Sequence, residues 1–389
     1  MFGGSFNPIH NGHVAVAAAV RERFQLETVL LMVAKDPPHK QIAGSVDGYA
    51  RLAMANAALA GREGLAASDI ELRREGKSYT ADTLRALASL YPGAQLSLIV
   101  GADMLCDLPN WREPEAICAM AEIIAVGRPK GGDCEAAARA LASRYGARVR
   151  LSGVCGPELS STEIRQRVLE ALPVDSLMPP GAAWLMYEKG LYQPERIVWM
   201  QEKLRATLKY SRYLHCVGAM ECAVELAARF GCDAKKARVA ALLHDCAKLP
   251  EDALIALAKE FGVTPSEYDL RAPGLLHDRV GAFLAQRDYG VEDEEILRAI
   301  GRHTLCACGM TKLDKVVYLA DKMERTRDYP GVEEIRAAAQ SDLERAVVLC
   351  MEHVIAHLRR QNHAIDPAIF TARAEISEQL QQKEREDET

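Results

Sequence analysis

The chain has 389 residues, of which 49% are hydrophobic, and its formal net charge is −6. This length predicts two or three domains with sizeable cores, and the acidic balance offers no basic surface to a nucleic acid. The eleven cysteines form no CxxC pair, no apolar run approaches the ~18 residues of a membrane span, and the first residues are not a signal peptide. We therefore expect an enzyme of the reducing cytoplasm, with neither a membrane nor a nucleic acid as partner.

The first half alternates between predicted strands and helices. Strands are expected at residues 28–34, 95–100, 122–126 and 147–151, with helical patterns between them such as 81–90. The second and third strands are nearly continuous apolar runs, which is typical of strands covered on both faces. The alternation predicts a parallel α/β sheet whose ligands lie at the carboxyl ends of its strands.

The opening segment is the most informative stretch of the chain. Residues 3–13 read GGSFNPIHNGH and lead into an apolar run that predicts a helix. Glycines let a ligand approach the backbone closely, and amides at a helix N-terminus attract phosphate. Imidazoles such as those of His10 and His13 can donate to phosphate oxygens. The segment therefore predicts a triphosphate-binding turn; the alternative is a glycine-rich turn with two surface histidines.

This opening resembles the GG(S/T)F(D/N)PxHxGH motif of bacterial nicotinate-nucleotide adenylyltransferases, which are nucleotidyltransferases with a Rossmann-like fold. Further segments similar to that family follow in order: PPHK at 37–40, SYTADTL at 78–84, GAD at 101–103 with LPNW at 108–111, GRP at 127–129, and SSTEIR at 160–165. The resemblance covers about residues 1–192. It implies transfer of an adenylyl group from ATP, accompanied by Mg²⁺, to nicotinate mononucleotide with release of pyrophosphate.

The resemblance also implies roles for single residues. His10 and His13 would be catalytic and contact the ATP phosphates, Trp111 would stack on the nicotinate ring, and Thr80 and Asp103 would help to bind substrates. The other candidates for the ATP and phosphate site are Gly3, Gly4, Ser5, Phe6, Gly12, Lys40, Gly101, Ser160, Ser161, Thr162 and Arg165.

Plainer interpretations exist for two of these candidates. Trp111 could be a core aromatic residue, although its neighbours predict a loop, and Arg165 could be an exposed helix arginine. Ser160 and Glu163 fit a capping box, so a helix whose amides could hold phosphate should begin at residue 161.

One feature departs from the family pattern. The family has an apolar strand before the glycine turn, whereas only Met1 and Phe2 precede it here, so this strand is expected to be missing or nearly so. We expect that the recorded start lies too late, because the later motifs are intact. The alternative is a lost core strand, which would make residues 1–192 a nucleotide-binding remnant.

The second half begins after a boundary at residues 190–194 and contains no convincing strand. Its apolar residues from 204 to 227 step by three and four until Gly231, as in an amphipathic helix. We expect a helical domain over residues 197–370. The polar tail at 377–389 is expected to be a frayed helix or disordered.

Histidines and aspartates in apolar helical contexts form a second constellation: His215, His244, Asp245, His277, His303 and Asp321. Such a mixture suits iron, manganese or zinc rather than calcium, which takes oxygen ligands. The pattern resembles that of HD-domain phosphohydrolases and, over about 197–370, of bacterial symmetrical diadenosine-tetraphosphate hydrolases. A single buried histidine would more often be a core residue, but here every ligand position is filled in order.

The resemblance implies two divalent metals, with iron expected and manganese or zinc as alternatives. Asp245 would bridge them and be catalytic; His215, His244 and Asp321 would complete one site, and His277 and His303 the other. Lys248 is expected to be a catalytic residue that neutralises a substrate phosphate, because it lies four residues after His244 on one helix face. Arg325 and Arg327 are weaker candidates. We interpret His353, His357, Cys306 and Cys308 as solvent-facing histidines and reduced thiols.

Three functions are therefore predicted as alternatives. The first is a bifunctional enzyme that adenylylates nicotinate mononucleotide and hydrolyses diadenosine tetraphosphate symmetrically into two ADP. In the second, only the hydrolase is active. In the third, the HD half is a sensor that binds nucleotides without cleaving them. The sequence leaves open a homo-oligomer and the preference for the acid over the amide mononucleotide.

Overall fold

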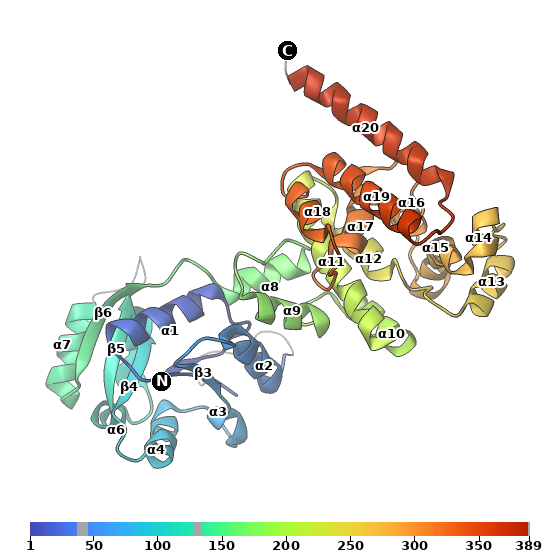
Figure 1. The fold of residues 1–389 in the computed structure, drawn as a ribbon. Coiled ribbons are helices and arrows are strands. Elements are labelled where there is room, and N and C mark those ends of the chain that lie inside the picture. Colours follow the sequence, from blue (N-terminus) through green and yellow to red (C-terminus); the bar gives the residue numbers. More distant parts are fainter. Residues whose placement is uncertain (37–45, 128–133, 388–389) are drawn as a thin grey trace. The chain divides into compact units, whose positions relative to one another are not determined.

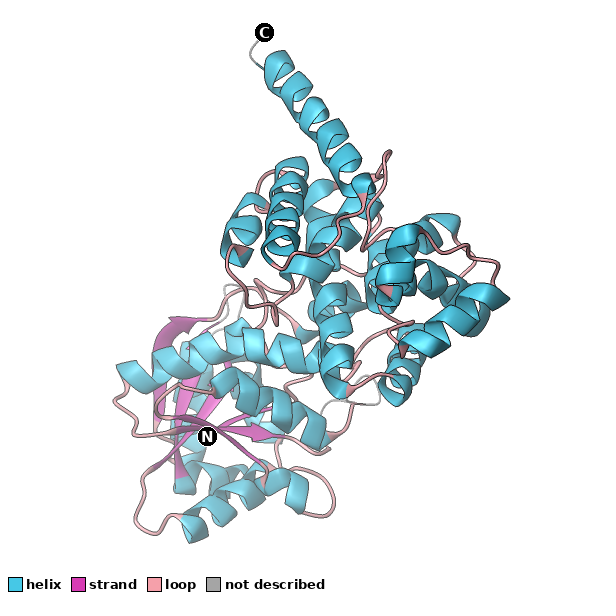
Figure 2. Ribbon diagram, turned by 45° about the vertical axis from the view of Figure 1, so that its right-hand side comes forward, coloured by secondary structure: helices cyan, strands magenta, loops and turns pink. Residues whose placement is uncertain are grey.

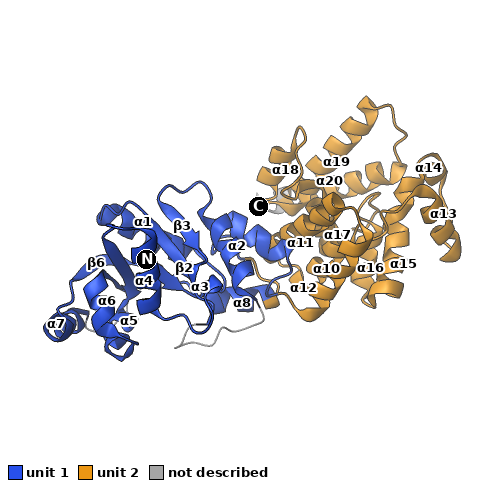
Figure 3. Cartoon of the chain, turned by 90° about the horizontal axis from the view of Figure 1, so that it is seen from below, with its two compact units in different colours: residues 1–168, 174–192 blue, residues 169–173, 193–389 orange. Residues whose placement is uncertain are grey.

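The computed structural model describes residues 1–36, 46–127 and 134–387, so Lys40 and the 37–40 segment lie outside the described residues. The chain divides into two compact units (Figure 3). The first comprises residues 1–168 and 174–192, and the second comprises residues 169–173 and 193–389. Among the described residues, no helix has the length and apolar character needed to cross a bilayer.

A six-stranded parallel sheet forms the centre of the first unit (Figure 2). The strands lie in the order β3-β2-β1-β4-β5-β6, which confirms the predicted parallel, Rossmann-like α/β fold. Their bounds are β1 Phe2–Gly4, β2 Val29–Val33, β3 Leu65–Ser68, β4 Leu96–Gly101, β5 Ala121–Gly127 and β6 Val149–Cys155.

The first strand is short but present at the centre of the sheet. Phe2 pairs with Leu31 of β2 on one side and with Ile99 of β4 on the other. Three residues thus suffice to join the two halves of the sheet, and the glycine turn follows directly from this strand. The sequence predicts that this strand is missing or nearly so. The structure shows that it is short, with three residues, but that it pairs on both sides.

Helices connect and cover these strands, as apolar runs such as those of β4 and β5 require. The predicted helix at 81–90 is α4, which begins one residue earlier. The helices of this unit are α1 Asn11–Arg23, α2 Gly48–Leu59, α3 Ile70–Arg73, α4 Thr80–Leu90, α5 Ala102–Asp107, the 3₁₀ turn η1 Leu108–Asn110, α6 Pro114–Met120, α7 Cys134–Tyr145, α8 Ser161–Leu169 and α9 Pro180–Glu188.

The described part of the second unit is helical throughout, as predicted (Figure 1). Gly231 ends α11 with φ of +65°, which explains why a glycine stops this helix. The last helix, α20, covers most of the polar tail. The elements are α10 Glu195–Thr207, α11 Tyr210–Phe230, α12 Ala234–Leu243, α13 Glu251–Glu260, α14 Glu267–Arg271, η2 Pro273–Leu276, α15 His277–Tyr289, α16 Glu294–Gly301, α17 Lys312–Met323, α18 Val332–Ala338, α19 Leu343–Arg360 and α20 Pro367–Asp387.

Candidate active sites of the two units

A cavity of about 930 Å³ opens in the first unit beside the carboxyl ends of β1 and β4. The strand order reverses between these two strands, which is where ligands bind in open α/β sheets. Most of the predicted nucleotide-site residues line this cavity: Gly3, Gly4, Ser5, His10, Gly12, His13, Thr80, Gly101, Asp103, Trp111, Ser160, Ser161 and Thr162.

Close packing explains the glycines of this cavity wall. A Cβ on Gly4 would lie 2.9 Å from the ring of Phe6, and one on Gly101 would lie 2.6 Å from a carboxylate oxygen of Asp103. Phe6 itself is buried beneath the turn and is not among the residues lining the cavity. The ring of Phe6 packs edge to face against that of His13, with 5.0 Å between the ring centroids, and so helps to fix the orientation of this histidine.

The two histidines of the motif stack at the start of α1. Their ring centroids lie 3.6 Å apart, and the backbone N–H of His10 donates to Nδ1 of His13 over 3.2 Å. Because Nδ1 of His13 accepts, the neutral ring carries its proton on Nε2 and can donate it to a ligand. Burial lowers the pKa of His10 to about 4, so this ring is neutral at neutral pH.

Side chains distant in sequence hold the turn that follows β1. Arg165 Nη1 donates to the carbonyl of Asn7 over 2.7 Å, Ser161 Oγ to that of Pro8 over 2.8 Å, and Tyr192 Oη to Asn7 Oδ1 over 2.6 Å. Arg165 therefore contacts the turn, and it is not among the residues lining the cavity. The hydroxyl of Ser160 accepts from the backbone N–H of Glu163 over 3.1 Å and so caps α8.

Sequence reasoning missed Arg51, which holds the same turn from α2. Its guanidinium donates to the carbonyls of Ser5 and Ala34, just beyond β1 and β2, and only 1% of the residue is exposed. A signal was available, because Arg51 lies on the helix stripe of buried residues that continues with Met54, Ala55 and Ala58. An arginine on an otherwise apolar stripe indicates a specific buried acceptor.

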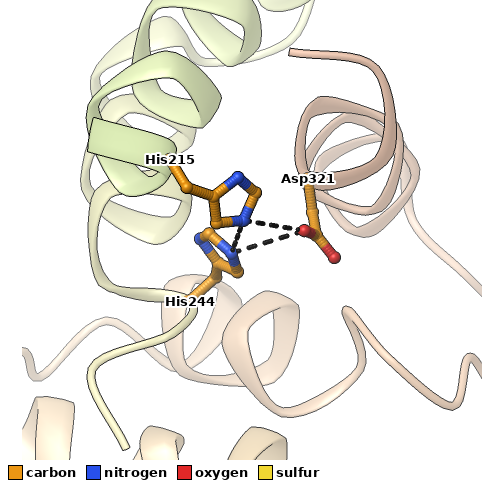
Figure 4. Close-up of side chains that lie close together, drawn as sticks. All are labelled: His215, His244 and Asp321. Carbon is orange, nitrogen blue, oxygen red and sulfur yellow. Dashed lines mark hydrogen bonds and ion pairs between the residues drawn. The ribbon is translucent and has the colours of Figure 1, made fainter. Parts of the chain in front are cut away.

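The second unit brings all six predicted metal ligands together in its interior. His215 lies on α11, His244 and Asp245 directly follow α12, and Asp321 lies on α17. His277 begins α15, and His303 follows α16. Figure 4 shows His215, His244 and Asp321 pointing toward one another.

The carboxylate of Asp245 lies between two groups of imidazoles. Its Oδ2 is 3.7 Å from Nε2 of His215 and 3.5 Å from Nε2 of His244. Its Oδ1 is 3.2 Å from Nε2 of His277 and 3.8 Å from Nε2 of His303. Asp321 Oδ1 adds to the first group, 3.0 Å from Nε2 of His215. One carboxylate thus faces two neighbouring positions, as a bridging ligand must.

Backbone acceptors orient three of the rings. Nδ1 of His244, His277 and His303 lies within 2.6–2.7 Å of the carbonyl oxygen three residues earlier. Since a carbonyl only accepts, these Nδ1 atoms carry the protons, and each Nε2 presents its lone pair to the centre in the neutral ring.

This arrangement fits divalent metal ions. Nε2 of His215 lies 3.1 Å from Nε2 of His244, and Nε2 of His277 lies 3.1 Å from Nε2 of His303. Lone pairs that face each other at this distance repel unless a cation lies between them. Imidazoles with carboxylates suit iron, manganese or zinc, and two groups of such ligands meet here.

Cationic side chains surround the ligands; Lys248 and Arg327 are among the sequence candidates, whereas sequence reasoning missed Arg212 and Lys322. Arg212 Nη1 lies 2.7 Å from Asp245, Arg327 Nη2 lies 2.6 Å from Asp321, and Lys322 also pairs with Asp321. Lys248 Nζ lies 3.2 Å from Nε2 of His277. Burial alone would raise the pKa of Asp321, but Lys322 and the histidines hold it well below its usual range.

Of the two arginines that are weaker candidates, one lies at the ligand cluster and the other does not. Arg327 reaches the ligand cluster, whereas Arg325 pairs with Glu221 at 3.3 Å. Among the described residues, neither group able to hold a metal ion includes any of His353, His357, Cys306 or Cys308. Cys306 is buried and Cys308 is exposed.

The fold and sites thus define a nucleotidyltransferase-type α/β unit joined to a helical unit with a metal-ligand cluster. A family model described as cytidylyltransferase-like matches residues 1–167, and an HD domain model matches residues 212–326. The HD domain implies that the helical unit binds divalent metal.

Curated relatives match each half over most of their own length. A symmetrical bis(5′-nucleosyl)-tetraphosphatase of Bacillus subtilis (strain 168) is 42% identical over 169 residues, which are 43% of this chain and 90% of that protein. A probable nicotinate-nucleotide adenylyltransferase of Synechococcus sp. (strain JA-3-3Ab) is 37% identical over 192 residues, 49% of this chain and 93% of that protein. The chain therefore belongs to both families, one in each half.

Among solved structures, a predicted HD superfamily hydrolase involved in NAD metabolism from Clostridium acetobutylicum aligns with a TM-score of 0.45 and 34% identity. It covers 46% of this chain and 96% of that structure.

Proposed function

We propose that the chain is a bifunctional enzyme. Its first unit joins ATP and nicotinate mononucleotide into deamido-NAD and pyrophosphate, and its second unit hydrolyses diadenosine tetraphosphate into two ADP. The cavity at the β1–β4 switch point, with paired histidines at the start of α1, supports the first activity. The six buried ligands that converge from five segments support the second.

In the first reaction, a phosphate oxygen of nicotinate mononucleotide attacks the α-phosphorus of ATP, and the bond from that phosphorus to pyrophosphate breaks. Such transfers depend on positioning and on stabilising charge. Nε2 of His13 donates to a phosphate oxygen, and the amides at the start of α1 and α8 face the polyphosphate. Trp111 stacks on the pyridine ring, and Thr80 and Asp103 bind substrate. His10, Gly3, Gly4, Ser5, Gly12, Gly101, Ser160, Ser161 and Thr162 complete the nucleotide site.

In the second reaction, water attacks an inner phosphorus of the tetraphosphate, and the bond between that phosphorus and the central bridging oxygen breaks. One ADP keeps the oxygen of water, and the other leaves with the bridging oxygen and a proton. Two divalent metals, of which iron is our first candidate, supply an activated water and neutralise phosphate charge when bound. Lys248, Arg212 and Arg327 bind the flanking phosphates, since each lies at the ligand cluster and is only partly buried.

A product assay tests both halves. We expect the purified chain, supplied with iron or manganese and diadenosine tetraphosphate, to yield ADP as the sole nucleotide product. ATP with AMP would contradict symmetrical cleavage, and metal-dependent binding without any product would favour the sensor. With ATP and Mg²⁺, we expect deamido-NAD from nicotinate mononucleotide. Failure to form it while hydrolysis proceeds would favour a nucleotide-binding remnant.

A further inference from the structure

One histidine of the metal-ligand cluster is oriented differently from the others. His244, His277 and His303 each use the backbone carbonyl three residues earlier. Nδ1 of His215 instead lies 3.0 Å from the carboxylate oxygen Oε1 of Glu324, a residue 109 positions further along the chain. An anionic acceptor makes the opposite ring nitrogen a stronger electron donor than a neutral carbonyl does.

The surroundings of Glu324 fix its carboxylate in place. The side chain is fully buried, and the burial penalty that would raise its pKa is outweighed by hydrogen bonds from His215 and Thr326, which lower the pKa. The backbone N–H of Thr326 donates to Oε2 over 2.7 Å, and its hydroxyl donates to Oε1 over 2.5 Å. Glu324 directly follows α17, the helix that carries Asp321.

A glycine on the opposite helix makes room for this carboxylate. Gly218 lies three residues after His215 on α11, and a Cβ there would be 2.3 Å from Oε2 of Glu324. The glycine and the glutamate are therefore complementary parts of one contact. A side chain at position 218 would displace the carboxylate of Glu324 from its place behind His215.

We propose that Glu324 is a positioning residue that makes the subsite of His215, His244 and Asp321 the tighter of the two metal sites. In the described part of the chain, Nδ1 of His277 and of His303 each faces a backbone carbonyl, and the subsite of these two histidines is the weaker one. This inference rests on the two-metal centre proposed above. The inference predicts that the two sites bind metal with unequal affinity. It attributes the higher affinity to the carboxylate of Glu324, which is not itself a metal ligand.

Calorimetric titration of the metal-free full chain with Mn²⁺ tests this assignment. We expect two binding steps for the wild type, and a loss of about 10–100-fold in the affinity of the tighter step for Glu324→Gln. The glutamine keeps the size of the side chain, but its amide NH₂ must face either Thr326 or His215. The weaker step should stay within about twofold of the wild type.

Two further variants separate positioning from folding. Gly218→Ala leaves the charges unchanged yet displaces the carboxylate, so it should weaken the same step. Gly281→Ala is the matched control, because a Cβ at this helical glycine of α15 meets its neighbours at ordinary distances of 3.5–3.7 Å. It should leave both steps unchanged, and circular dichroism should show equal helix content in every variant.

A double-mutant cycle that combines Glu324→Gln with His215→Ala tests whether Glu324 acts through His215. If Glu324 acts through His215, Glu324→Gln should cause no further loss of affinity once His215 is replaced. A further loss of tenfold or more, an equal weakening of both steps by Glu324→Gln, or wild-type affinities in that variant would each overturn the inference. A wild type that binds no metal would instead overturn the metal centre itself.

Discussion

Buried polar side chains lie at both candidate sites. His10 is an example, because its ring is buried at a helix start and its Nδ1 has no hydrogen-bond partner in the described part of the chain. A buried imidazole without an anionic partner resists protonation, so burial lowers its pKa to about 4. The motif predicts a histidine at this position, but only its surroundings determine that the ring is neutral.

This neutrality predicts a pH-dependent stability. Between pH 6.5 and about 4 the unfolded chain binds a proton at His10 that the folded chain does not, so stability falls as the pH is lowered through this window. At pH 5 the cost is about 2 kcal/mol, since one pKa unit is worth ~1.4 kcal/mol. We expect His10→Asn to lose less stability than the wild type between pH 7 and pH 5 when nucleotide-free protein is unfolded by urea. Equal losses would contradict the assignment.

At the scale of elements, helices place the side chains that shape each site. In the first unit, α2 and α8 approach the turn after β1 and donate to its carbonyls through Arg51, Ser161 and Arg165. In the second unit, α11 and α17 carry His215 and Asp321, α15 begins at His277, and the other candidate ligands follow the ends of α12 and α16. The turn after β1 thus owes its conformation to helices that lie far along the chain.

Replacing Arg51 tests whether the turn after β1 depends on the donors that hold it. A lysine keeps the charge but is a point donor, and it cannot bridge the carbonyls of Ser5 and Ala34 as the planar guanidinium does. One carbonyl would lose its partner, at a cost of about 1–3 kcal/mol. We expect Arg51→Lys to lower the stability of the first unit and the kcat for adenylyl transfer, with a smaller change in KM.

The control for this prediction is Arg73→Lys, because Arg73 is exposed and pairs with Asp69 at the surface. It should leave stability and kcat unchanged. A kcat equal to that of the wild type in Arg51→Lys would show that the turn is held without this bridge.

At the level of the whole molecule, the described residues of each candidate site belong to one unit. The lining residues of the cavity in the first unit lie between 1 and 163, and the candidate metal ligands of the second unit lie between 215 and 321. The described residues of each unit include a buried core of their own.

This separation predicts independent loss of the two activities. We expect His13→Ala to reduce adenylyl transfer by about 10²–10³-fold, as loss of a transition-state donor does, with modest loss of mononucleotide binding and unchanged hydrolysis. Asp245→Ala should abolish both metal binding and hydrolysis while adenylyl transfer continues. Assays of both reactions on both variants check this. Full hydrolysis by Asp245→Ala would refute the two-metal proposal, and an unchanged transfer rate in His13→Ala would refute its role.

The amino-acid sequence predicts the class of the fold and the identity of the candidate ligands. Alternating apolar strands and helices predict the parallel sheet, and glycines and histidines in a fixed order mark the nucleotide turn, because local spacing encodes both. The six candidate ligands of the second unit lie far apart in the chain, and the resemblance to HD-domain phosphohydrolases identifies them as a set. The family resemblance implies that these residues converge around Asp245, and in the structure the carboxylate of Asp245 lies near imidazoles of both groups.

The residues that support these groups become apparent in the folded chain and not in its sequence. Glu324 lies 109 residues from His215, and Tyr192 lies 185 residues from Asn7, so no local pattern links either pair. Likewise, Gly218 looks like an ordinary helical glycine until α17 is packed against α11. Helix packing determines these contacts, because the partner of a buried polar group depends on which element the fold brings beside it.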